Sequence, residues 1–124
     1  MQELPKQLDD FLAEAKEKVS TMSCEEYEDA RRRKVDHALI DVREEDEFAE
    51  GHIEGAINIP RGEIEFKISE AVPNKATPIM MCCKTGRRAL LAALTLVEMG
   101  YSDVRVLDGG YIGYCKFNGA LKDS

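Results

Sequence analysis

The residues best suited to chemistry in this sequence are the six from Cys83 to Arg88, which read Cys-Lys-Thr-Gly-Arg-Arg. They lie between an apolar stretch (residues 79–82) that is typical of a buried strand and a helix-like stretch (residues 89–99). Backbone N–H groups in a glycine-containing turn and at a helix N-terminus both favour negative charge. Such surroundings lower the pKa of a thiol, and the thiolate is the nucleophile. The segment therefore predicts covalent, nucleophilic chemistry at Cys83.

The same region differs from the rest of the chain in charge. The protein carries a net charge of −7, yet residues 71–97 contain no Asp or Glu and hold Lys75, Lys84, Arg87 and Arg88. A basic window around a cysteine in an acidic protein favours a small anionic substrate that is attracted to that window. The alternative is that these are solvated charges of a loop and a helix. The net acidity argues against general nucleic-acid binding.

The bulk composition indicates a single soluble domain. The chain has 124 residues, of which 44% are hydrophobic and 33% are charged. It has four cysteines without a C-x-x-C pair and only two histidines, which argues against a zinc site, and no motif calls for a cofactor. Residues 1–20 lack the apolar run of a signal peptide or a membrane span. We therefore expect a cytoplasmic protein with free thiols and no membrane partner, while the oligomeric state stays open.

Alternating strand and helix patterns predict the architecture. The predicted strands span residues 38–42, 56–59, 79–82 and 104–107, and the predicted helices span residues 23–32, 45–49, 64–71, 87–99 and 111–118. This alternation predicts an α/β fold with a central parallel sheet flanked by helices on both faces. Residues 1–22 predict an amphipathic helix packed on a domain of residues 23–124, with its apolar face formed by Leu4, Leu8, Phe11, Leu12, Ala15 and Val19.

Three separate segments are expected to meet at one edge of this sheet. The loop that starts at Cys83 follows the third predicted strand, Asp41-Val42-Arg43 ends the first, and residues 108–110 follow the last. Ligands of open α/β sheets bind outside the C-terminal ends of the strands, where these segments lie.

Several motifs in order resemble the rhodanese (sulfurtransferase) family. Residues 40–44 (Ile-Asp-Val-Arg-Glu), Glu47-Phe48 and residues 51–60 are similar to the first signature of that family. Residues 83–89 resemble its active-site loop, C-x-x-G-x-R-[SA], and residues 98–101 with 107–110 resemble its closing segment. The resemblance covers about residues 23–119 and implies a single rhodanese-like domain.

The resemblance implies a two-step transfer of sulfur through Cys83. Its thiolate attacks the outer sulfur of an anionic donor such as thiosulfate, sulfite leaves, and a persulfide remains for cyanide or a thiol to accept. The donor or acceptor could also be a partner protein, through a persulfide or a thiol. Substrate-binding roles are expected for Lys84, Thr85, Gly86, Arg87 and Arg88. Arg88 has the alternative role of a brace within the loop, and Asp41 and Arg43 are expected to support the pocket.

Two other readings of the cysteine loop stay open. Residues 82–88 also satisfy C-x5-R, the loop of related phosphatases and arsenate reductases, with Cys82 as the nucleophile. Strand alternation, however, points the Cys82 side chain away from that of Cys83, as expected for a buried, inert thiol. The other reading is a rhodanese-like binding module without enzymatic activity, against which the intact cysteine loop argues.

Overall fold

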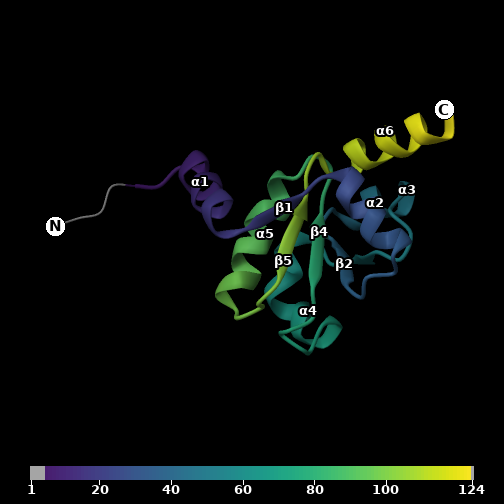
Figure 1. The fold of residues 1–124 in the computed structure, drawn as a ribbon. Coiled ribbons are helices and arrows are strands. Elements are labelled where there is room, and N and C mark those ends of the chain that lie inside the picture. The colour runs from purple at the N-terminus through teal and green to yellow at the C-terminus, as the bar shows by residue number, and fades with distance from the viewer. Residues whose placement is uncertain (1–4, 124) are drawn as a thin grey trace.

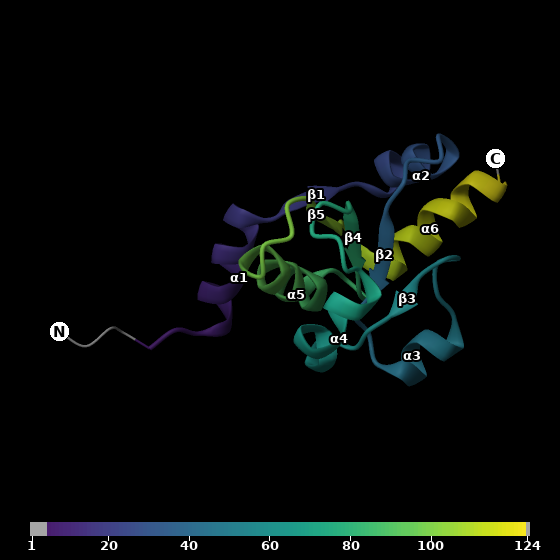
Figure 2. The same ribbon diagram turned by 90° about the horizontal axis from the view of Figure 1, so that it is seen from below.

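The structure is a computed structural model that describes residues 5–123, so the expected place of Leu4 in the first helix lies outside the described residues. Within them, five parallel strands form one sheet in the order β1-β5-β4-β2-β3. Figure 1 labels the first four strands of this order, and Figure 2 also labels β3. The strands are β1 (Ser20–Met22), β2 (Ala38–Asp41), β3 (Ile57–Asn58), β4 (Ile79–Cys82) and β5 (Val104–Leu107). The α/β fold with a parallel sheet, predicted from the alternating patterns, is confirmed.

Helices cover both faces of the sheet (Figure 2). The helices are α1 (Leu8–Lys18), α2 (Cys24–Arg32), α3 (Glu45–Glu50), α4 (Ile64–Ala71), α5 (Arg87–Glu98) and α6 (Gly110–Asp123), with a 3₁₀ turn at Arg61–Glu63. One core cluster joins α1, α4 and α5 to residues of one face, such as Ile40 and Met81. The other cluster joins α2 and α6 to the opposite face through Leu39, Met80 and Leu107. None of the helices within residues 5–123 is both long and apolar enough to cross a membrane.

The first helix packs against α5. Leu12 and Ala15 of α1 are buried in the same core cluster as Leu90 and Leu94 of α5. Leu8 at the start of α1 stays half exposed. The division of the chain at residue 22 stays a prediction.

The short strand β1 was not expected from the sequence. Ser20–Met22 pairs in parallel with Arg105–Leu107 and forms an edge of the sheet. A Ser-Thr-Met run carries no apolar stretch that would mark a strand, so its placement comes from the partner strand. The last helix also begins earlier than expected, at Gly110, because Gly109 and Gly110 complete the turn with φ angles of 81° and 61°.

The C-terminal ends of β2, β4 and β5 meet at one edge, as predicted for parallel strands. The Val42 N–H donates to the Cys82 carbonyl at 2.9 Å, which ties the segment after β2 to the end of β4. The Tyr111 N–H donates to the Cys83 carbonyl at 2.8 Å, which ties the start of α6 to the loop after β4. This edge therefore assembles the segments that carry Cys83, Arg43 and Gly110.

Candidate active site

The thiol of Cys83 lies where β4 ends and α5 begins. Its Sγ accepts hydrogen bonds from the Gly86 N–H at 3.1 Å and the Ala89 N–H at 3.3 Å. Gly86 is the N-cap of α5, has a φ of 113°, and supplies no side-chain cap, so the sulfur occupies the capping position. The side chain of Cys83 is only 1% exposed. The sulfur is therefore held among N–H donors at a helix N-terminus, where the partial positive charges of these groups face it.

The N-terminus of α6 forms hydrogen bonds to the backbone of the loop that begins at Cys83. The N–H groups of Tyr111 and Ile112 donate to the carbonyls of Cys83 and Lys84 at 2.8 and 3.2 Å. Gly110 makes this approach possible, because a Cβ at that position would lie 2.6 Å from both carbonyl oxygens. The loop carbonyls are thus bonded to α6.

The charged side chains of the loop fall into two groups. Lys84 and Arg87, like Thr85 between them, are exposed to solvent. Arg88 instead forms a bidentate ion pair with Glu47 of α3, with distances of 2.7 and 3.1 Å. The hydrogen bonds from Arg88 lower the pKa of Glu47 to about 2, against the opposing effect of burial. This geometry fits the brace that was one of the two roles expected for Arg88, and its role in catalysis stays a prediction.

Asp41 and Arg43 form a buried ion pair beside the loop. Asp41 is 0% and Arg43 4% exposed, and the Arg43 Nη2 donates to Asp41 Oδ2 at 2.8 Å. The guanidinium also donates to the carbonyls of Glu47 and Gly51 and lies 4.4 Å from the centre of the Tyr111 ring. Burial disfavours the charged form of Arg43 and so lowers its pKa. The hydrogen bonds to Asp41 and the negative charge of Asp41 outweigh this effect, so the pKa of Arg43 is raised. The pair connects β2, α3 and α6, and its support of a substrate pocket stays a prediction.

Cys82 faces the opposite side of the sheet from Cys83. It is 0% exposed and packs in the cluster of Leu39 and Met80, whereas Cys83 belongs to the cluster of α5. Burial, and then the negative charge of Asp41, raise the pKa of the Cys82 thiol far above its ordinary value. The predicted alternation of the two side chains is confirmed, and Cys82 has the properties of an inert core thiol.

The other cysteines lie apart from this arrangement. Cys24 is half buried and donates to the Asp108 carbonyl at 3.6 Å, whereas Cys115 on α6 is exposed. In the part of the chain that the structure describes, no three His, Cys, Asp or Glu side chains gather as a group that could hold a metal ion.

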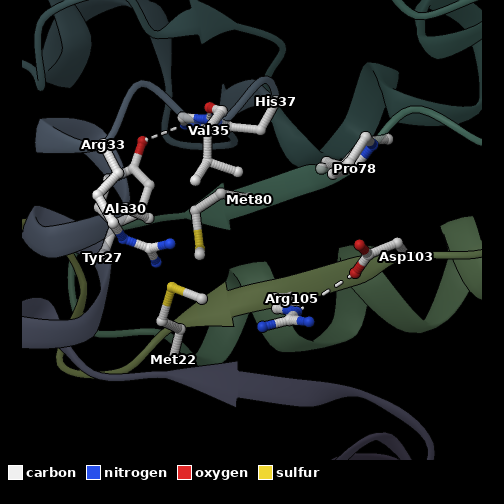
Figure 3. Close-up of a pocket in the computed structure, with 11 residues that line it drawn as sticks. Met22, Tyr27, Ala30, Arg33, Val35, His37, Pro78, Met80, Asp103 and Arg105 are labelled. Atoms are coloured by element: carbon white, nitrogen blue, oxygen red, sulfur yellow. Dashed lines mark hydrogen bonds and ion pairs between the residues drawn. The ribbon is translucent and has the colours of Figure 1, made fainter.

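A cavity of about 200 Å³ lies at the other end of the strands, and Figure 3 shows its lining. Met22 and Met80 point toward each other across it, and Asp103 and Arg105 form an ion pair on its rim (Figure 3). Pro78 and Asp103, which precede β4 and β5, place it at the N-terminal ends of these strands. The cavity is therefore separate from the Cys83 loop.

Sequence reasoning missed part of the Cys83 site. The resemblance to the first signature places Glu47 in a motif without assigning it a partner, and the structure shows that this partner is Arg88. The donors at Ala89, Tyr111 and Ile112 are backbone groups, which leave no mark on residue type. A signal for Ala89 existed, because it is the third residue of the predicted helix, where the N–H lacks a helical partner.

Comparison with known proteins identifies the family. The rhodanese-like domain family matches residues 23–116, so the chain belongs to that family. It is 40% identical over 70 residues to the thiosulfate sulfurtransferase PspE of Escherichia coli, and the aligned residues cover 56% of this chain and 67% of that protein. It is 34% identical over 90 residues to thiosulfate sulfurtransferase 18 of Arabidopsis thaliana, covering 63% and 66% of the two chains. The chain thus spans about two thirds of the length of these relatives.

A solved structure agrees with this assignment. The human single-domain sulfurtransferase TSTD1 superposes with a TM-score of 0.70 at 27% identity, covering 79% of this chain and 96% of that one. The rhodanese-like fold expected from the motifs is therefore confirmed. The names of the relatives support sulfur transfer as the general class of activity.

Proposed function

We propose that this protein transfers sulfane sulfur through a persulfide on Cys83. The Cys83 thiolate attacks the outer sulfur of thiosulfate, the S–S bond of the donor breaks, and sulfite leaves with the bonding electron pair. The product is a persulfide anion on Cys83. No proton, oxidant or metal takes part, so a preformed thiolate is the only chemical requirement.

The observation that carries this proposal is the pair of N–H donors on Sγ. The Gly86 and Ala89 N–H groups lie 3.1 and 3.3 Å from the sulfur at the N-terminus of α5. They stabilise a thiolate before the reaction, and the loop can receive the charge of the terminal persulfide sulfur afterwards. Lys84 and Arg87 are exposed on this loop and are suited to attract the sulfonate of the donor.

The acceptor completes the cycle. Cyanide attacks the terminal sulfur of the persulfide, the S–S bond breaks, and thiocyanate leaves while the Cys83 thiolate returns. A thiol can take the sulfur in the same way, and a persulfide on another protein can replace thiosulfate as the donor. We expect ping-pong kinetics, because donor and acceptor meet the same atom in turn.

The alternative nucleophile is disfavoured by its surroundings. A phosphatase or arsenate reductase that used Cys82 would need a reactive thiolate, but this thiol packs on the opposite face of the sheet from Cys83 and its N–H donors, and burial raises its pKa. A binding module without activity would have no need for the N–H donors that surround Cys83.

The proposal is tested with the wild type, Cys83→Ser and Cys82→Ser. Thiosulfate:cyanide activity is measured for each protein, and its intact mass is recorded after treatment with thiosulfate. We expect wild type and Cys82→Ser to gain one sulfur atom and form thiocyanate, and Cys83→Ser to do neither. If Cys82→Ser lost activity while Cys83→Ser stayed folded and active, the result would favour the C-x5-R reading, in which Cys82 is the nucleophile. Absence of added sulfur on every protein, with thiosulfate or with a persulfide donor, would favour the binding module.

A further inference from the structure

The cavity at the N-terminal ends of β4 and β5 lies between the sheet and the end of α2. Met22, Met80 and Arg105 reach it from β1, β4 and β5, which are neighbours in the sheet (Figure 3). Tyr27 of α2 and Arg33, the C-cap of that helix, line it from the other side. A molecule in this cavity would therefore rest between a strand surface and a helix, apart from the cysteine loop.

The inside of the cavity is apolar and small. Tyr27 and Met80 are only 1% and 4% exposed, and the side chains of Met22 and Met80 point toward each other across the space (Figure 3). Methionine thioethers adapt their shape and make favourable contacts with aromatic rings. The volume of about 200 Å³ is below the roughly 300 Å³ at which pockets for drug-sized ligands begin, so the space suits one ring on a short chain.

Arg105 occupies an unusual place in the sheet. It belongs to an inner strand, since β5 lies between β1 and β4. Its side chain shares a face with the buried Leu107 two residues on and with its in-register partner Met80, yet it is exposed. Core packing would favour an apolar residue at this position, whereas an anion-binding site needs a cation beside an apolar surface.

The two guanidinium groups of the lining have donors available. Arg33 donates to Asp29 through Nε at 3.0 Å, and Arg105 donates to Asp103 through Nε at 3.3 Å. Among the residues that the structure describes, these are the only side-chain hydrogen bonds of the two arginines, so their Nη1 and Nη2 groups are available to a ligand. A guanidinium presents such paired donors in the geometry that a carboxylate accepts.

The other polar groups of the lining are engaged or negative. The Nδ1 of His37 lies 2.8 Å from the Val35 carbonyl, and its Nε2 lies 2.8 Å from the Tyr27 hydroxyl, which also accepts from Arg31 at 3.2 Å. Among the described lining residues, Asp103 is the only carboxylate. Its negative charge opposes a phosphate dianion more strongly than a singly charged ligand, so the lining favours a monocarboxylate.

We propose that this cavity binds a small aryl carboxylate, an aromatic ring on a short chain that ends in a carboxylate. The ring lies between Met22 and Met80, and the carboxylate accepts hydrogen bonds from Arg33 and Arg105. The site is separate from the loop that carries Cys83, so the proposal does not depend on sulfur transfer.

The test follows the methionine methyl groups by NMR in protein labelled with carbon-13 at these groups. The probe is 3-phenylpropionate, compared with its uncharged amide, 3-phenylpropanamide, and with acetate, which lacks the ring. Met22→Leu and Met80→Leu assign the two signals from the cavity. Met81 and Met99 pack with the core cluster of the other sheet face, and their signals serve as internal references for specificity and for folding of each variant.

We expect 3-phenylpropionate to shift the Met22 and Met80 signals saturably, with a Kd of about 5 mM, the affinity typical of a ligand of this size. The amide should bind about tenfold more weakly, because it loses the charge that two guanidinium groups recognise, and acetate should cause no saturable shift.

Arg33→Gln and Arg105→Gln are each expected to weaken binding of the acid roughly three- to fivefold, the effect of one accessible ion pair, and to leave binding of the amide unchanged. Arg32→Gln is the matched control, because Arg32 is exposed, directly precedes Arg33 and does not line the cavity. It should leave the affinity for 3-phenylpropionate unchanged.

Absence of a saturable shift at Met22 and Met80, or equal shifts at Met81 and Met99, would overturn the binding site. Equal affinity for the acid and the amide would overturn the recognition of a carboxylate. A loss of affinity in Arg32→Gln as large as that in Arg33→Gln would show that general charge, and not this cavity, attracts the probe.

Discussion

Glu47 of α3 and Arg88 of the cysteine loop meet in a two-point ion pair, although 41 residues separate them. The two bonds measure 2.7 and 3.1 Å and join the segment after β2 to the first turn of α5. The backbone carbonyl of the same Glu47 accepts a hydrogen bond from Arg43. One residue thus connects the buried Asp41–Arg43 pair to the loop that holds Cys83.

The first prediction concerns the dependence of stability on pH. The pKa of Glu47 is lowered to about 2, so the ion pair stabilises the fold above the ordinary carboxyl pKa and this contribution is lost as pH falls through about 2. We expect Glu47→Gln to lower the free energy of unfolding by roughly 0.5–1 kcal/mol at pH 7, since the pair is partly exposed. Urea unfolding at several pH values should show that the difference in free energy of unfolding between wild type and Glu47→Gln is constant above about pH 5 and vanishes toward pH 2.

Glu54→Gln is the control for this experiment, because Glu54 is exposed and its side chain forms no ion pair among the described residues. A difference between wild type and Glu47→Gln that grew as pH fell from 5 to 2 would contradict the lowered pKa.

The second prediction concerns the glycine that lets α6 approach the loop. Gly110→Ala should cost about 3 kcal/mol or more, because φ is 61° and the new Cβ would lie 2.6 Å from two carbonyl oxygens. Gly55→Ala shares the positive φ, 88°, but meets no atom within 4 Å, so it should cost about 1 kcal/mol. Gly119→Ala has neither problem and should be neutral or stabilising. The free energies of unfolding of the three variants, measured in urea, separate the cost of backbone strain from the cost of steric overlap. Equal losses of stability in Gly110→Ala and Gly55→Ala would contradict the close approach of α6 to the loop.

The third prediction compares two Asp-x-Arg pairs of equal spacing. Asp41 and Arg43 are buried, and Asp41→Asn should cost about 3–5 kcal/mol because it leaves a buried guanidinium without its partner. Asp103 and Arg105 form an exposed pair at 3.3 Å, and Asp103→Asn should cost less than about 1 kcal/mol. The two free energies of unfolding, measured in urea, give the comparison, and similar values would mean that the buried guanidinium finds another partner or water.

The fourth prediction concerns the order in which the cysteines react. Iodoacetamide at pH 8 should modify the exposed Cys115 before the buried Cys82. Cys82 should stay unmodified in the folded protein, because it is 0% exposed and burial raises the pKa of its thiol. Peptide mass mapping at increasing times, with and without urea, measures the order. Modification of native Cys82 as fast as that of Cys115 would show that this face of β4 opens readily.

Residue patterns predicted the central elements of the fold because burial is strongest there. β4 and β5 have the predicted bounds, and α4 begins and ends as expected, since apolar runs and helical spacing leave little choice of register. Ser23 and Glu26 form a capping box at the start of α2, with distances of 3.1 and 3.2 Å, and their spacing of three residues is typical of this motif. Local rules suffice where a residue and its partner are close in the sequence.

Other parts of the site depend on contacts that local rules do not describe. Four carboxylates occur between Glu44 and Glu47, and residue type alone does not say which one meets Arg88. His37 lies 2.8 Å from the hydroxyl of the buried Tyr27, because the chain turns back after α2. Long-range pairing of this kind follows from topology and not from spacing.

Cys82 ends β4 and Cys83 directly follows it, and their side chains pack on opposite faces of the sheet. This placement has a consequence for the lifetime of the proposed persulfide. Because the two side chains pack in different core clusters, Cys82 is not placed to release the proposed Cys83 persulfide by forming a disulfide. Without that route, the lifetime of the loaded protein depends on how often an outside acceptor arrives. On the proposed mechanism, the protein takes up sulfur at one place and delivers it at another, and so acts as a carrier as much as a catalyst.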